Sequence, residues 1–165
     1  MKYAVWAVGV FILALLQVAL NNYLPAYLAP DLFLMLIMYM TLYYGYYTTL
    51  LGIVVLSYIS SVFSSGSVWF FMFSYVSVFY LLNFFKKYFD RKQIPAIVTL
   101  SLLTTLAYSL FVLPLSVFAG KTALFGAAIR LGLIQAIANI AAACLIFKYV
   151  PRIDRRIETG VHAAP

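Results

Sequence analysis

A long stretch of the chain carries no charged side chain, and this feature limits the possible fold more than any other. Residues 32–85 contain neither an acid nor a base. A helix needs about 20 mostly apolar residues to cross the hydrocarbon core of a bilayer, so the stretch is long enough for two or three crossings. Over all 165 residues only 9% are charged, against about 25% in an ordinary soluble domain. The sequence therefore predicts an all-α, polytopic integral membrane protein.

Turn-forming and aromatic residues divide the apolar sequence into six predicted transmembrane helices. The aromatic cluster around Gly45 is typical of a membrane interface, and SSGS at residues 64–67 predicts a turn. The predicted crossings are residues 3–20, 32–44, 46–63, 68–85, 97–118 and 123–147. The second is short, and we expect Tyr43 and Tyr44, or a locally thinner bilayer, to complete it. Residues 1–150 are then a single transmembrane domain, and residues 151–165 are a basic cytoplasmic tail.

The basic residues predict the orientation. With six crossings, both termini and the loop at residues 86–95 lie on one side, with nine of the eleven Lys and Arg residues. Because Lys and Arg collect in cytoplasmic loops, we expect that side to be the cytoplasm. Five crossings, with residues 32–63 fused into one helix, would move only Lys2 to the other face, but such a helix is far longer than a bilayer requires. No nucleic-acid motif accompanies the net charge of +7.

The predicted spans offer few groups for chemistry. Asp31 and Arg130 are the only strong acid and base close to them, Cys144 is alone, and the one histidine, His162, lies in the tail. Paired carboxylates, a histidine cluster or a phosphate-binding glycine loop cannot be assembled from these residues. We therefore expect a protein without catalytic residues, metal ligands or a cofactor.

Asp31 and Arg130 each allow two interpretations. Asp31 follows Pro30 at the start of the second predicted helix, on the outer face, where its carboxylate can stay near water and cap the helix. Arg130 lies about two turns from the outer end of the sixth span. It can snorkel to the headgroups or pair with a partner inside the membrane. Asp31 would be its partner within the chain.

Small and polar residues mark the helix faces where close packing is expected. Gln17 is a polar residue inside the first span. The third span carries Ser57 and Ser61 at helical spacing. The sixth carries a stripe of Gly132, Ala136, Asn139 and Ala143. Such faces either pack within the molecule or accept the helix of a partner protein.

Several of these features together resemble MreD, a family of bacterial rod-shape-determining proteins. The resemblance covers residues 10–85. It rests on Gln17 within LALLQ, the proline-containing loop, the sequence PDLFLMLIMYMTLYYG, Gly52 and the SSGS turn. The third span of the family usually contains a second glycine and then an acid, where this chain has Leu56 and then Ser60 or Ser61.

The resemblance implies a fold similar to that of the substrate-binding subunits of energy-coupling-factor transporters, but a scaffold function. It implies a protein of the bacterial inner membrane that binds MreC, a single-span protein with a periplasmic domain, together with other cell-elongation proteins that place lateral peptidoglycan synthesis. Membrane lipid is the other expected partner. The candidate residues for partner binding or helix packing are Gln17, Asp31, Gly52, Ser57, Ser61, Arg130, Gly132, Ala136 and Asn139.

Two other functions are considered. The first is a substrate-binding subunit for uptake of a small molecule such as a vitamin, which would need a polar cavity that opens outward among Asp31, Arg130 and aromatic side chains. The second is a lipid-modifying enzyme, which would need a set of acids or histidines that this sequence does not provide.

Overall fold

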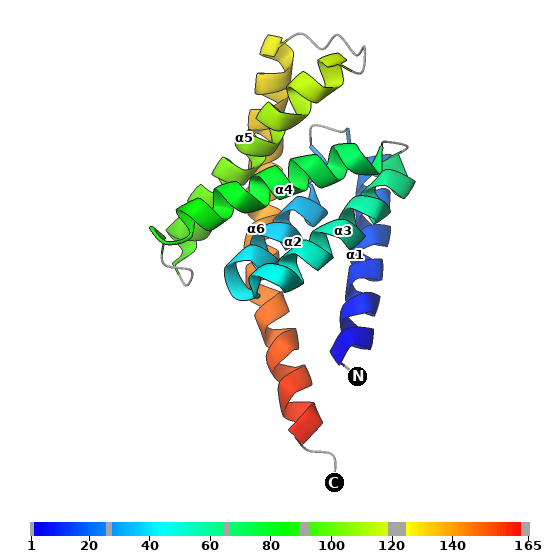
Figure 1. Ribbon diagram of the computed structural model, residues 1–165, viewed down its shortest axis with the longest axis vertical. Coiled ribbons are helices and arrows are strands. Elements are labelled where there is room, and N and C mark those ends of the chain that lie inside the picture. The colour runs from blue at the N-terminus through cyan, green and yellow to red at the C-terminus, as the bar shows by residue number, and fades with distance from the viewer. Residues whose placement is uncertain (1, 26–27, 65–66, 90–92, 119–124, 163–165) are drawn as a thin grey trace.

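The computed structural model describes the backbone of residues 2–25, 28–64, 67–89, 93–118 and 125–162, and within them the side chains of residues 8–25, 28–63, 67–89, 93–111 and 132–151. This described part of the chain forms six α-helices and no strand (Figure 1). The helices are α1 (Lys2–Tyr23), α2 (Leu32–Tyr43), α3 (Tyr46–Ser64), α4 (Val68–Phe85), α5 (Ile94–Phe118) and α6 (Phe125–His162). The prediction of an all-α fold is confirmed.

Four of these helices contain a segment that is long and apolar enough to cross a membrane. The segments are Tyr46–Phe63, Val68–Phe85, Ile94–Phe111 and Gly132–Pro151. The described part of α1, Val8–Tyr23, and α2 are shorter apolar helices. Large apolar side chains also face outward, and Trp69 and Ile137 are 74% and 71% exposed. Contiguous apolar surface of this kind is unfavourable in water, so the arrangement is compatible with a multi-pass membrane protein.

The short helix α2 forms the centre of the molecule. All of its residues except Met40 and Tyr43 are buried, and it contacts each of the other five helices. Its 12 residues extend about 18 Å, which is less than the hydrocarbon core of about 30 Å. Because α2 is enclosed by protein rather than lipid, its length does not have to match the bilayer. Enclosure is therefore an explanation for this short segment that does not require a thinner bilayer.

The boundary between α2 and α3 lies where the sequence predicted it. α2 ends at Tyr43, and α3 begins at Tyr46 after Gly45. The Thr49 hydroxyl lies 3.1 Å from the carbonyl oxygen of Met40 and 3.0 Å from that of Gly45, so it bonds to the end of one helix and the start of the next. This break confirms that residues 32–63 are not one long helix.

The start of α5 and the end of α6 differ from the predicted crossings. α5 begins at Ile94 rather than at residue 97, because Pro95 lies in the first turn, where its missing N–H removes no helical hydrogen bond. α6 continues through Pro151 to His162, whereas the predicted crossing stopped at residue 147. A crossing ends where the apolar residues end, but a helix can continue into water when its residues favour helix formation.

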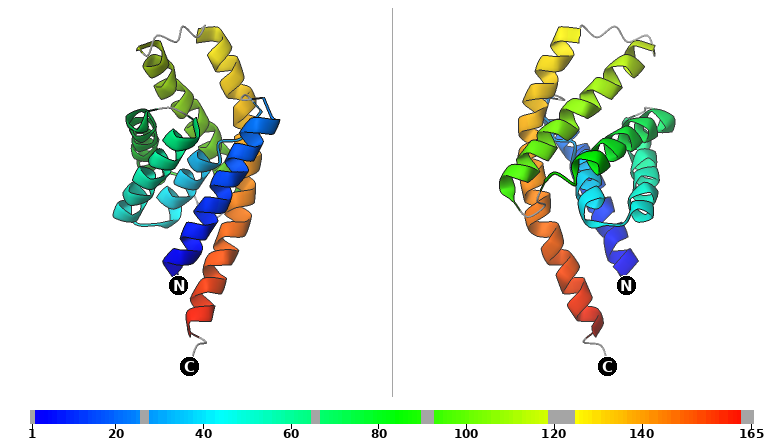
Figure 2. Two further views of the ribbon diagram at one scale, coloured as in Figure 1. Left: turned by 90° about the vertical axis from the view of Figure 1, so that its right-hand side faces the viewer. Right: turned by 60° about the vertical axis from the view of Figure 1, so that its left-hand side comes forward.

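The start of α1 and the end of α6 lie at the same end of the molecule (Figure 2). In the left-hand view α1 runs alongside the middle of α6. α5 and α6 share the most extensive contact between helices, and α3 and α4 pack on the other side of α2 (Figure 1). α1 packs chiefly against α2. This loose attachment of α1 leaves room on both of its sides.

Candidate functional site

The N-terminus of α2 lies inside the helix bundle. The backbone N–H of Asp31 donates a 2.7 Å hydrogen bond to Oδ1 of Asn139, a fully buried residue of α6. This hydrogen bond holds the start of α2 at the level of Asn139 in α6. The expectation that Asp31 lies at the outer face of the membrane stays a prediction.

The loop before Asp31 is also bound to α6. After α1 ends, the chain turns back into the bundle, and Ala29 is buried. The side-chain amide of Gln135 donates a 3.4 Å hydrogen bond to the carbonyl oxygen of Ala29. Pro30 and Asp31 follow directly, so the contacts of this loop hold the start of α2 against α6.

Side chains satisfy the backbone donors at the start of α2, which have no partner within the helix. The N–H of Leu32 donates to Oε1 of Gln17 over 2.8 Å, and the N–H of Leu34 donates to Oδ1 of Asp31 over 2.9 Å. The Asp31 carboxylate also accepts from the N–H of Phe33. In hydrocarbon no water can replace these partners. The expected role of Asp31 as the N-cap is confirmed.

The network continues from α6 into α5. Nδ2 of Asn139 donates a 2.9 Å hydrogen bond to Oγ1 of Thr105, and that hydroxyl donates to the carbonyl oxygen of Ser101. We call Gln17, Asp31, Thr105 and Asn139 the polar clamp. It joins α1, α2, α5 and α6, and thus brings together three residues that the sequence identified separately.

Thr105 is the member of the polar clamp that the sequence did not identify. A threonine in an apolar helix usually bonds to the carbonyl oxygen four residues earlier, as Thr104 does with Leu100. Nothing in the local sequence distinguishes Thr105 from Thr104. Its additional bond to Asn139 depends on how α5 and α6 are paired.

Tyr75 of α4, which is buried, and Tyr108 of α5, which is partly buried, form an aromatic pair between the two helices. Their rings are stacked with their centroids 5.8 Å apart. The Tyr75 hydroxyl also forms a 3.0 Å hydrogen bond with Ser60. Ser60 is one of the two positions where the MreD pattern has an acid, and here it binds a tyrosine hydroxyl.

The candidate glycines lie where helices approach closely. A Cβ on Gly52 of α3 would meet the end of the Met40 side chain of α2, with the sulfur 3.0 Å away. A Cβ on Gly132 of α6 would lie 3.0 Å from Oγ of Ser109 of α5. Both glycines therefore permit a close contact with a neighbouring helix.

The other candidates differ in their surroundings. Ala136 is buried one turn before Asn139 in α6. Ser57 is fully buried and donates to the Ile53 carbonyl of its own helix over 2.7 Å, whereas Ser61 is half-buried. The Arg130 side chain lies outside the described residues, so its pairing with Asp31 stays a prediction.

Two apolar grooves flank α1. The α1–α6 groove, of about 710 Å³, is lined by Gly9, Ile12, Leu13, Leu16, Leu20, Leu24, Pro30, Leu32, Leu36, Ala138, Ala141, Ala142, Leu145, Ile146, Tyr149 and Val150. The α1–α3 groove, of about 810 Å³, is lined by Val10, Phe11, Ala14, Leu36, Met40, Tyr44, Thr48, Leu51, Gly52, Val55, Leu56, Tyr58, Ile59, Val62 and Phe63. Asp31 lines neither groove.

Comparison with known proteins does not assign the chain to a family. No protein-family model, no curated protein and no solved structure matches it. The function is therefore inferred from the polar clamp and the two grooves, together with the sequence pattern.

Proposed function

We propose that this protein is a non-enzymatic membrane scaffold of the bacterial cell-elongation machinery, which controls rod shape by binding a single-span protein of the MreC type. In this proposal the chain crosses the inner membrane six times, with both termini in the cytoplasm. Its fold is similar to that of energy-coupling-factor substrate-binding subunits. The observation that carries the proposal is the α1–α3 groove, which has the features of a binding site for one transmembrane helix.

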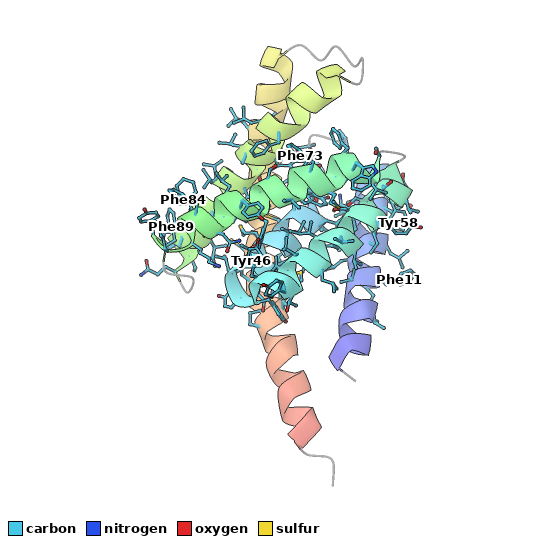
Figure 3. All side chains as sticks on the ribbon, in the orientation of Figure 1. Phe11, Tyr46, Tyr58, Phe73, Phe84 and Phe89 are labelled. Carbon is cyan, nitrogen blue, oxygen red and sulfur yellow. The ribbon has the colours of Figure 1, made fainter. Side chains whose placement is uncertain are left out.

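The lining of the α1–α3 groove supports a helix as its occupant. Transmembrane helices associate through small residues, which allow close approach, and through interhelical hydrogen bonds. Ala14 and Gly52 supply small positions in the wall, and Thr48 and Tyr58 supply hydroxyl groups. From Thr48 to Phe63 the groove follows α3 for about 22 Å. Figure 3 shows Phe11 of α1 and Tyr58 of α3 at this edge of the molecule.

The polar clamp supports a structural rather than a catalytic role for its residues. Gln17 and Asn139 use their carbonyl oxygens to hold the backbone at the start of α2. The Asp31 carboxylate caps the same helix. α2 forms part of the floor of both grooves through Leu36. A fixed α2 therefore gives both grooves a defined shape, which is what a scaffold requires.

Site-specific photo-crosslinking in cells tests the proposal. A photoreactive phenylalanine analogue replaces Val55, an exposed residue of the α1–α3 groove. The matched control replaces Leu110, an exposed residue of α5 that lines neither groove. We expect an adduct with a single-span cell-elongation protein at position 55 and none at position 110. Equal adducts at both positions, or no protein adduct at position 55, would contradict the scaffold.

Purification in mild detergent separates this proposal from small-molecule uptake. Mass spectrometry identifies the proteins and small molecules that accompany the tagged chain. A single-span cell-elongation protein supports the scaffold. A vitamin, or a pair of ATPases, supports an uptake subunit and contradicts the scaffold.

A further inference from the structure

The α1–α6 groove differs from the α1–α3 groove in its chemistry. Among the described residues that line it, Tyr149 is the only one whose side chain has a polar atom. The groove follows α1 from Gly9 to Leu24, which is about 22 Å. One leaflet contributes about 15 Å, half of a hydrocarbon core of about 30 Å. The groove is thus long enough to take a whole acyl chain.

A basic side chain stands at one end of this groove. The ammonium group of Lys148 lies 5.6 Å from the centroid of the Tyr149 ring, which lines the groove. Lys148 is exposed and directly follows the uncharged residues 131–147. A lysine at this position reaches the lipid headgroups readily. The groove is therefore apolar along its length and positively charged at the end that lies nearer to both chain termini (Figure 2).

We propose that the α1–α6 groove is a binding site for an anionic phospholipid, with an acyl chain along α1 and the phosphate beside Lys148. The argument is charge complementarity, because a phospholipid is an apolar chain with a negative group at one end. Basic sites between transmembrane helices recognise anionic headgroups in this way. A partner helix would need no charge at that end, and along the groove it would find no hydroxyl or amide before Tyr149. This inference is independent of the scaffold function.

Native mass spectrometry of the purified full-length protein tests the site. The protein is titrated with dioleoylphosphatidylglycerol, and with dioleoylphosphatidylethanolamine as the zwitterionic comparison. We expect tighter binding of the phosphatidylglycerol, and a loss of about fivefold in Lys148→Gln, the change expected when one Lys–headgroup interaction near the surface is removed. Lys87→Gln is the matched control, because Lys87 also lies over a tyrosine ring, that of Tyr88, but beside neither groove.

A second pair of variants tests the groove rather than the charge. Ala141 is an exposed wall residue, so Ala141→Trp fills the groove without disturbing the core and should also lower phosphatidylglycerol binding. Leu110→Trp, outside both grooves, should not. Equal losses in Lys148→Gln and Lys87→Gln would show a general effect of charge and overturn the proposal. Unchanged phosphatidylglycerol binding in Ala141→Trp would also overturn the proposal. So would a photoreactive phenylalanine analogue in place of Leu145, an exposed residue of the same groove, if it formed an adduct with a protein instead of a lipid.

Discussion

The side-chain carbonyl of Asn139 accepts a hydrogen bond from the backbone N–H of Asp31, and so joins residues 108 positions apart in the chain. The first N–H groups of a helix have no acceptor within the helix and often bond to water. Here the Asn139 side chain takes the place of that water. Because α2 begins within the bundle, its first donors depend on α1 and α6 instead. The start of α2 is thus held by residues outside α2.

Replacement of Asn139 by leucine should destabilise the protein. The N–H of Asp31 would be left buried without an acceptor, and Thr105 would lose its bond from Nδ2. We expect the free energy of unfolding to fall by about 1–3 kcal/mol, measured by SDS titration followed by circular dichroism. Asn83→Leu is the control, because the Asn83 amide donates within its own helix to Phe79 and the loss should be smaller. Equal losses would show that Asn139 has no special role in joining the helices.

Substitutions of Asp31 should distinguish its capping function from its charge. Asparagine caps a helix about as well as aspartate, whereas alanine costs about 1 kcal/mol. We therefore expect the free energy of unfolding of Asp31→Asn to stay close to that of the native protein. That of Asp31→Ala should fall by about 1 kcal/mol, again measured by SDS titration. If both lose equally, the charge itself is required, and Arg130 is the first candidate partner. Additive effects of Asp31→Asn and Arg130→Gln would then exclude direct contact between them.

The helices were largely predictable from the sequence, but the contacts of Asp31 were not. Gly45 and the apolar runs are local features, so they predicted the breaks between helices. The contacts of Asp31 depend on the loop that folds back into the bundle, and on acceptors from Gln17 and Asn139. The sequence identified both as polar residues in apolar helices, but it did not show that they meet at one helix terminus. Thr105 became distinguishable only when its partner was known.

Alanine substitutions of two glycines should have different effects because their neighbours differ. At Gly52 the new Cβ meets the flexible end of Met40, and alanine gains up to about 1 kcal/mol in helix propensity. We expect the stability of Gly52→Ala to stay within about 0.5 kcal/mol of the native protein. At Gly132 the new Cβ meets Ser109, whose short side chain is bonded to the Thr105 carbonyl. We expect Gly132→Ala to lower the free energy of unfolding by about 1 kcal/mol, measured by SDS titration. A larger loss in Gly52→Ala than in Gly132→Ala would contradict the packing described for these helices.

Cysteine labelling in intact cells tests the proposed orientation. Six crossings with cytoplasmic termini place Ser67 outside and Lys87 inside, as the positive-inside rule requires of the basic loop that follows α4. Both side chains are exposed. In a Cys144→Ala background, a membrane-impermeant maleimide should label Ser67→Cys in intact cells, but Lys87→Cys only after permeabilisation. Reporter fusions at the two ends should both report the cytoplasm. Labelling of position 87 in intact cells, or fusions that report different compartments, would show that the chain does not cross the membrane as proposed.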